Sequence, residues 1–134
     1  APAKTPATQD LTGKGTILLV EDEDGVRVFG ARALRNKGYT VIEANSGEAA
    51  LAVMDSFDGD IDLLITDVVM PQMDGATLIE RVRADHPDFK VILISGYAED
   101  SFRERLAATE DVTFLPKPFS LIQLAGVVKT VIEA

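Results

Sequence analysis

Short apolar runs alternate with longer amphipathic stretches from Thr16 to the end of the chain. The runs ILLV, LLIT and VILI stay apolar without alternation, which is typical of strands buried on both faces of a parallel sheet. The pattern predicts strands at Thr16–Val20, Thr40–Ala44, Ile61–Thr66, Lys90–Ile94 and Val112–Leu115.

Segments with a helical period lie between these runs and after them. Ser46 and Glu48 supply a cap and an acid at one helix start, and Gly38 follows another helix as its terminating glycine. His86-Pro87 ends a third helix. The predicted helices are Asp24–Lys37, Ser46–Asp55, Gly75–Asp85, Glu99–Ala108 and Ser120–Glu133.

Strands that alternate with helices in this way predict an open α/β sheet with right-handed crossovers. Such sheets bind ligands at the carboxyl ends of their strands. Residues 1–13 are small, polar and proline-bearing, so we expect a flexible linker or tag remnant there. The domain is expected to span residues 14–134.

The composition of the chain excludes several kinds of site and disfavours some classes of function. The 134 residues fit one domain, and the absence of cysteine excludes disulfides, thiol catalysis and cysteine-ligated metals. His86 is the single histidine, which excludes a site built from several imidazoles. A net charge of −9 disfavours nucleic-acid binding through phosphate contacts. No apolar run approaches the ~18 residues of a membrane span and no signal peptide is visible, so a cytoplasmic location is expected.

Chemically active side chains follow the predicted strands. Glu21 and Asp22 follow the first, Asp67 the third, Ser95 the fourth and Lys117 the fifth. In a parallel sheet these groups meet at one edge. Carboxylates at contact distance repel by about 4 kcal/mol per pair at an effective dielectric of about 20. Such a cluster calls for a cation, and hard oxygen ligands select Mg²⁺.

The same groups suit one reaction. A Mg²⁺ ion and the Lys117 ammonium would neutralise an incoming phosphoryl group, and the Ser95 hydroxyl would donate to a phosphoryl oxygen. A carboxylate between them could act as nucleophile and form an acyl phosphate. The pattern therefore indicates phosphoryl transfer to an aspartate.

From about Lys14 to Ala134 the chain resembles a response-regulator receiver domain. The resemblance rests on Glu21-Asp22, on Asp67 in DVVMPQMDG, on Ser95 in ILISG and on Lys117-Pro118-Phe119. It implies a flavodoxin-like, doubly wound (βα)5 fold with a five-stranded parallel sheet in the order 2-1-3-4-5.

The resemblance also implies a role for each residue of the site. Asp67 is the expected phosphoacceptor. Mg²⁺ would be bound by Asp22, Asp67 and the backbone carbonyl of Val69, with Glu21 acting through a water. Lys117 would pair with the phosphoryl oxygens, across a cis peptide to Pro118.

Further positions concern the response to phosphorylation. Ser95 takes the hydroxyl role and Phe114 the position of an aromatic switch, which here would rest on packing alone because phenylalanine has no hydroxyl. Val69 and Tyr97 flank the site and are expected to modulate the lifetime of the phosphoryl group. The domain would contribute to its own phosphorylation and hydrolysis without turning over a metabolite.

A narrower resemblance concerns the parent protein. SGYAEDSFRERL and FLPKPFSLIQL resemble the C-terminal receiver of a cell-cycle hybrid histidine kinase. This implies a phosphohistidine-bearing kinase domain as donor and a histidine phosphotransfer protein as acceptor. The receiver would lie on the cytoplasmic side, which is compatible with an inner-membrane anchor in the parent kinase.

Two alternatives stay open at this point. One is a stand-alone, single-domain response regulator. The other is a phosphohydrolase of the haloacid-dehalogenase type, in which Asp22 would be the nucleophile and Asp24 the acid–base. That enzyme class needs a second acid pair after the fourth strand, where this chain has Ser95-Gly96-Tyr97.

The first predicted helix carries two apolar stripes, and a surface helix needs only one for its own core. One stripe holds Val28, Ala31 and Leu34, and the other holds Val26, Phe29 and Ala33. Either the second stripe docks a histidine-bearing helical partner, or the helix is buried on two sides.

Overall fold

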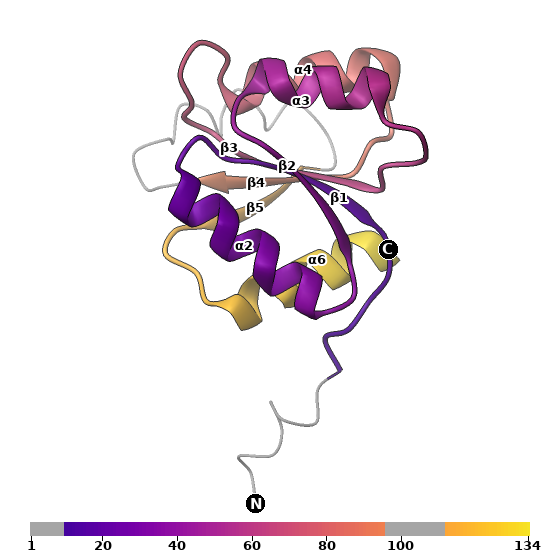
Figure 1. Ribbon diagram of the computed structural model, residues 1–134, viewed down its shortest axis with the longest axis vertical. Helices are drawn as coiled ribbons and strands as arrows, with labels where there is room; N and C mark the ends of the chain where they lie inside the picture. Colours follow the sequence, from indigo (N-terminus) through magenta and orange to yellow (C-terminus); the bar gives the residue numbers. More distant parts are fainter. Residues whose placement is uncertain (1–9, 96–111) are drawn as a thin grey trace, which may run out of the picture.

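The computed structural model describes residues 10–95 and 112–134 (Figure 1). Within them, five parallel strands form one sheet in the order β2-β1-β3-β4-β5, which confirms the predicted fold and strand order. The strands are β1 (Thr16–Val20), β2 (Thr40–Ala44), β3 (Leu63–Asp67), β4 (Val91–Ser95) and β5 (Val112–Pro116).

Helices cover both faces of the sheet (Figure 1). Those that the structure describes are α2 (Asp24–Asn36), α3 (Gly47–Ser56), α4 (Gly75–Asp85) and α6 (Leu121–Glu133). α2 and α6 lie on one face, and α3 and α4 on the other. The predicted helix Glu99–Ala108 falls outside the described residues. Among the described helices, none has the length and apolar character needed to cross a bilayer.

Side-chain caps set the starts of three helices. Ser46 accepts a hydrogen bond from the backbone N–H of Ala49, Asp74 accepts one from Thr77, and Ser120 forms a reciprocal capping box with Gln123. Each of these helices follows the loop that leaves the carboxyl end of a strand. The caps therefore help to define the loops at the carboxyl edge of the sheet.

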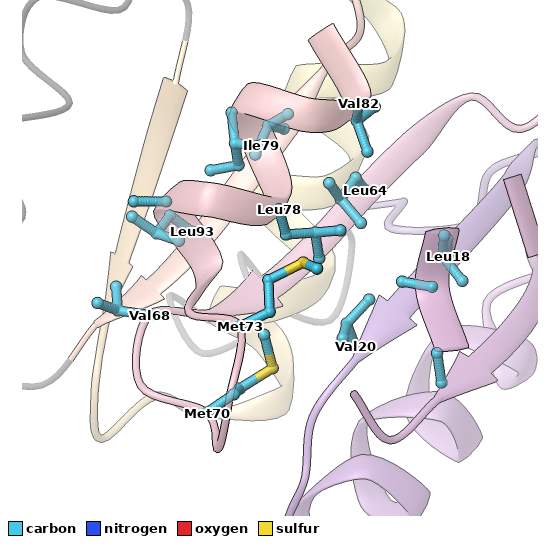
Figure 2. Close-up of a cluster of buried hydrophobic side chains, with 14 residues drawn as sticks. Leu18, Val20, Leu64, Val68, Met70, Met73, Leu78, Ile79, Val82 and Leu93 are labelled. Carbon is cyan, nitrogen blue, oxygen red and sulfur yellow. The ribbon is translucent and has the colours of Figure 1, made fainter. Parts of the chain in front are cut away.

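The central strands β1, β3 and β4 are mostly apolar because alternate residues enter two different cores. In β1, Leu18 and Val20 face α3 and α4, whereas Ile17 and Leu19 face α2 and α6. Figure 2 shows the first of these cores, in which the side chains of α4 lie over the sheet. The labelled residues are Leu18, Val20, Leu64, Val68, Met70, Met73, Leu78, Ile79, Val82 and Leu93.

Small shifts at the strand ends bring functional residues into the sheet. β3 starts at Leu63 instead of Ile61 and continues to Asp67, which is in register with Ile94 of β4. β4 likewise continues to Ser95, in register with Pro116 of β5. Asp67 and Ser95 are therefore the last residues of their strands and not loop residues.

The outward side of α2 differs from the predicted stripes. Ala31 and Leu34 are buried, but Val28 of the same stripe is 46% exposed, so only part of this stripe faces the core. The helix turns Gly30 to the sheet instead, at a contact where a Cβ would already lie 3.5 Å from a leucine side chain of β1. Phe29 is 57% exposed, which contradicts the hypothesis that this helix is buried on two sides.

The segment that the composition assigns to a linker packs at its last four residues. Leu11 is buried, and the N–H of Gly13 donates to the carbonyl of Lys37 over 2.8 Å. The Lys129 ammonium donates to the carbonyl of Asp10 over 2.7 Å. Residues 10–13 thus form a strap that joins the end of α2 to α6.

Candidate functional site

The residues expected at the strand ends meet at the carboxyl edge of the sheet. Glu21 directly follows β1, Asp67 ends β3, Ser95 ends β4 and Lys117 directly follows β5. Parallel strands in the order 2-1-3-4-5 bring these residues together because β1, β3, β4 and β5 are consecutive neighbours in the sheet. Gly96 and Tyr97 lie outside the described residues.

Glu21, Asp22 and Asp67 form an acidic cluster. Each offers one carboxylate oxygen, and these oxygens all lie within 4.8 Å of one another. Glu21 and Asp67 are buried while Asp22 is exposed. Burial, followed by the negative charge of Asp67, raises the pKa of Glu21 to about 8, despite the opposing hydrogen bond from the Glu23 N–H.

One oxygen of this cluster lacks a partner. The Oε2 atom of Glu21 accepts a hydrogen bond from the Glu23 N–H over 3.0 Å, but Oε1 is buried with no hydrogen-bond partner among the described residues. A buried carboxylate oxygen in this state is destabilising unless a donor or a cation reaches it. The donor set, made only of hard oxygens, fits a divalent cation such as Mg²⁺.

Lys117 contacts the same cluster from β5. Its Nζ lies 2.7 Å from Oδ2 of Asp67, and its backbone N–H donates to the Ser95 carbonyl over 2.9 Å. Burial by itself lowers the pKa of this ammonium, but the hydrogen bond and charge of Asp67, with the charges of Glu21 and Glu23, raise it above its ordinary value. Lys117 is therefore protonated beside Asp67 at neutral pH.

The neighbours of Asp67 and Lys117 shape the entrance to the site. The Val69 N–H donates to Oδ1 of Asp67 over 3.3 Å, and the Val69 side chain is 55% exposed. The peptide bond between Lys117 and Pro118 is cis.

Ser95 and Phe114 lie on the same face of adjacent strands. Ser95 is in register with Pro116, and Leu93 with Phe114, so the two candidate switch residues are two register positions apart. Ser95 is buried, whereas Phe114 is half-buried against the core formed with α3 and α4. A movement of one side chain toward the other would require no change of strand pairing.

Two residues of the site were not singled out in the sequence analysis. Gly75 lies so close to Asp67 that a Cβ there would be 2.3 Å from the Asp67 carbonyl oxygen. Arg27 donates from Nη1 to the Glu21 carbonyl over 2.9 Å. A glycine at a helix start and an arginine in an amphipathic helix are both common, so no local sequence pattern predicts either contact.

Comparisons with known proteins agree with this geometry. The family model described as "Response regulator receiver domain" matches residues 17–129. The sensor kinase CckA of Brucella abortus is 54% identical over 130 residues, which is 97% of this chain and 14% of that protein. This chain therefore spans only a small part of that relative. The response regulator receiver protein CpdR of the same organism is 35% identical, over 88% of this chain and 97% of its own length.

A solved structure extends the likeness to three dimensions. The crystal structure of the receiver domain of the hybrid histidine kinase CckA superposes with a TM-score of 0.74 at 43% sequence identity. The match covers 88% of this chain and 99% of that domain.

Proposed function

This chain belongs to the family of response regulator receiver domains, and we propose that Asp67 accepts a phosphoryl group from a phosphohistidine in a Mg²⁺-dependent reaction. One observation carries the proposal. The Asp67 carboxylate lies between the Lys117 ammonium, 2.7 Å from its Oδ2, and the oxygens of Glu21 and Asp22. A carboxylate held between a cation and a candidate cation site is equipped to attack an anionic phosphoryl group.

The reaction moves the phosphoryl group from an imidazole nitrogen to a carboxylate oxygen. A carboxylate oxygen of Asp67 forms a bond to phosphorus while the phosphorus–nitrogen bond of the phosphohistidine breaks. The electron pair stays on the imidazole nitrogen, which takes up a proton from solvent. Lys117 remains beside the new acyl phosphate and donates to a phosphoryl oxygen.

The expected Mg²⁺ ion would be held by Asp22, Asp67 and the Val69 carbonyl, with Glu21 acting through a water. When bound, it supplies positive charge that offsets the phosphoryl oxygens and the clustered carboxylates. The partnerless Oε1 of Glu21 supports this assignment, because a cation with its bound water provides what that oxygen lacks.

Phosphorylation would then act through packing. The Ser95 hydroxyl donates to a phosphoryl oxygen and shifts inward, and the space that it leaves admits Phe114. The face formed by β5, α6 and the predicted helix Glu99–Ala108 repacks as a result. This is a shift between two packings of one fold, driven by the added charge at the sheet edge.

The relatives support a position in a phosphorelay. Identity of 54% to part of CckA favours the receiver of a hybrid histidine kinase, which would pass the group to a histidine phosphotransfer protein. CpdR, which this chain matches over nearly its whole length, supports the alternative of a stand-alone regulator. A histidine kinase core encoded directly upstream would favour the hybrid, and a start codon there would favour the regulator.

The exposed side of α2 is the proposed docking surface for the histidine-bearing partner. Val28 and Phe29 are large apolar residues exposed to solvent, and Phe29 also lines a small cavity with Glu21 of the acidic cluster. They line a groove of about 430 Å³ together with Asp24, Gly25 and Arg32. Exposed apolar residues of this kind mark interaction surfaces, and an amphipathic partner helix would cover them.

Substitution of the acceptor tests the proposal. Asp67→Asn should abolish labelling by a radioactive phosphohistidine donor and by acetyl phosphate, because an amide oxygen is a poor nucleophile. The control is Asp62→Asn, which removes a carboxylate at the other end of β3. Label on Asp22 in the unaltered protein, located by peptide mapping, would instead support the phosphohydrolase alternative.

The docking surface has its own test. Phe29→Ala should slow transfer from the phosphohistidine protein at least fivefold, while transfer from acetyl phosphate and the melting temperature stay nearly unchanged. Acetyl phosphate serves as the control because it is too small to use the α2 groove. A large loss of stability would show that Phe29 belongs to the core.

A further inference from the structure

Arg27 connects three parts of the molecule beside the site. Its Nη1 donates to the Glu21 carbonyl over 2.9 Å, its Nη2 lies 2.8 Å from Oδ1 of Asp24, and its Nε lies 3.3 Å from Oε1 of Glu43. These partners belong to the turn after β1, the start of α2 and the edge strand β2. The Arg27 side chain is only 14% exposed, whereas its partner Asp24 is 83% exposed.

The turn that Arg27 contacts carries two of the three clustered carboxylates. The N–H of Glu21 donates to the Ala44 carbonyl of β2 over 3.0 Å, and the Glu21 carbonyl accepts from Arg27. Both main-chain polar groups of Glu21 are therefore held from outside the turn. Its side chain is then left to face Asp22 and Asp67.

Arg27 and Lys117 contact different kinds of atom at the site. Lys117 contacts a carboxylate oxygen of Asp67 directly, whereas Arg27 contacts a main-chain carbonyl behind the cluster. The Asp24 carboxylate beside Arg27 raises the pKa of the guanidinium, so the charge is permanent. Arg27 can thus support the acidic turn without competing for its ligand oxygens.

Glu43 connects Arg27 to a second arginine of the same helix. Arg35 lies 3.1 Å from Oε2 of Glu43 through Nη1, and its Nη2 donates to the Val41 carbonyl over 2.7 Å. Arg27 and Arg35 therefore share one helix, one acidic partner and one kind of carbonyl contact. Only Arg27 reaches the turn of the site.

We propose that Arg27 is a positioning residue for cation binding, which holds the turn of Glu21 and Asp22 where their carboxylates share one ion with Asp67. The inference deepens the proposed function and rests on it for the identity of the cation. Groups that orient metal ligands from behind are commonly worth about tenfold or more in metal affinity.

The matched variants are Arg27→Gln and Arg35→Gln, compared in Mg²⁺ titrations followed by the amide NMR signals of Glu23 and Val69. Arg27→Gln should weaken Mg²⁺ binding about tenfold, and Arg35→Gln should change it less than twofold. Arg27→Gln should lower the urea midpoint more than Arg35→Gln, because the Arg27 side chain is the more buried of the two, so the Mg²⁺ titrations are made under conditions in which both variants are folded. Equal weakening in the two variants, or none in Arg27→Gln, would overturn the proposal.

Arg27→Lys covers the case in which Arg27→Gln does not fold. A lysine keeps the charge but has no planar fork with which to reach three partners. Its Mg²⁺ affinity should therefore be lower than that of the unaltered protein, by up to about tenfold. An affinity equal to that of the unaltered protein would show that charge alone acts, and would overturn the positioning role.

The phosphorylation rate separates this proposal from the proposed function. Saturating Mg²⁺ should restore the labelling of Arg27→Gln by acetyl phosphate to within about twofold of the unaltered protein. A rate that stays low would show that Arg27 acts in more than cation binding, and would overturn the inference. Absence of label on Asp67 in the unaltered protein would refute the proposed function, while the Mg²⁺ titrations would still decide the role of Arg27.

Discussion

Charged side chains make different kinds of contact at the two ends of the sheet. At the amino end, charged side chains contact the main chain: Asp62 accepts from the N–H of Thr16 over 2.8 Å, and Lys90 donates to the Ile132 and Ala134 carbonyls over 2.9 Å each. At the carboxyl end, charged side chains contact one another, as Lys117 does with Asp67. The first arrangement completes the fold, whereas the second gathers three carboxylates, those of Glu21, Asp22 and Asp67, next to the Lys117 ammonium.

The two ends of the sheet also differ in the buried oxygen that lacks a hydrogen bond. The described residues contain two buried side-chain oxygens without a hydrogen bond, the hydroxyl of Tyr39 under the strap and Oε1 of Glu21. The first belongs to a neutral group, but the second belongs to a carboxylate beside two others. Buried and mutually repelling charges destabilise a fold, and they persist where a ligand compensates them. The carboxyl end is thus arranged for a ligand and the amino end for stability.

The pH dependence of stability should expose this contrast most strongly. The raised pKa of Glu21, about 8, means that the folded, metal-free protein keeps a proton there up to about that pH, whereas the unfolded chain loses it near the ordinary value of 4.5. The folded state therefore binds more protons between these values, and the free energy of unfolding should fall as pH rises through them. The slope attributable to Glu21 should be on the order of 1 kcal/mol per pH unit.

Urea denaturation in a chelator at pH 5 and at pH 8 measures this effect. Glu21→Gln should remove most of the slope, because glutamine does not titrate. Saturating Mg²⁺ should also flatten it, since a cation favours the carboxylate form. A variant whose pH slope equals that of the unaltered protein would contradict the assignment.

Two glycines provide a matched pair of packing tests, one at each end. A Cβ at Gly75 would lie 2.3 Å from the Asp67 carbonyl oxygen, and a Cβ at Gly38 would lie 2.5 Å from that of Gly13 in the strap. Gly38 also has a φ of 106°, which disfavours a side chain. Each alanine variant should lose on the order of 2 kcal/mol of stability.

Only Gly75→Ala should also weaken Mg²⁺ binding, because it displaces the strand end that carries Asp67. Thermal melts and Mg²⁺ titrations of both variants make the comparison. If Gly38→Ala weakened Mg²⁺ binding equally, the two ends of the sheet would not be independent.

Two lysines test the charges alone. Lys117→Met and Lys90→Met should each destabilise the metal-free protein by about 1 kcal/mol. Mg²⁺ should restore the stability of Lys117→Met, because the ion replaces the lost positive charge beside Asp67. It should leave the deficit of Lys90→Met unchanged, and urea midpoints with and without Mg²⁺ would show whether it does.

The smallest expected effects are gains in stability. A Cβ at Gly25, at the start of α2 beside the site, or at Gly126, inside α6, would meet nothing within 4 Å. Alanine at either position should stabilise the protein by about 0.5–1 kcal/mol in thermal melts, through the unfolded chain. Equal gains would show that the instability of the carboxyl end comes from its charges and not from its backbone.

Local sequence patterns were sufficient to predict the bounds of several strands and helices. The bounds of Thr16–Val20, Thr40–Ala44 and Gly75–Asp85 agree between sequence and structure, because apolar runs and helical periods depend on neighbours in the chain. The strand order came from a family resemblance and not from the pattern itself. The placement of Glu21, Asp67, Ser95 and Lys117 at one edge followed once the strands were taken as parallel.

Contacts between distant segments were decided only by the tertiary structure. The strap looks like a linker in composition, yet Leu11 is buried and Gly13 bonds to Lys37 because the end of α2 lies beside it. Val28 fits an apolar stripe, but the orientation of α2 on the sheet leaves it in solvent.

The same division holds for the site. The carboxylates and the lysine carry their chemistry in their residue types, so the sequence by itself determined which groups could bind a cation and a phosphoryl oxygen. The link from Arg27 to the Glu21 carbonyl and the close approach of Gly75 to Asp67 involve main-chain atoms, which are the same in every residue. Only folding decides which of those atoms a side chain meets, and so only the tertiary structure decided how this acidic turn is held.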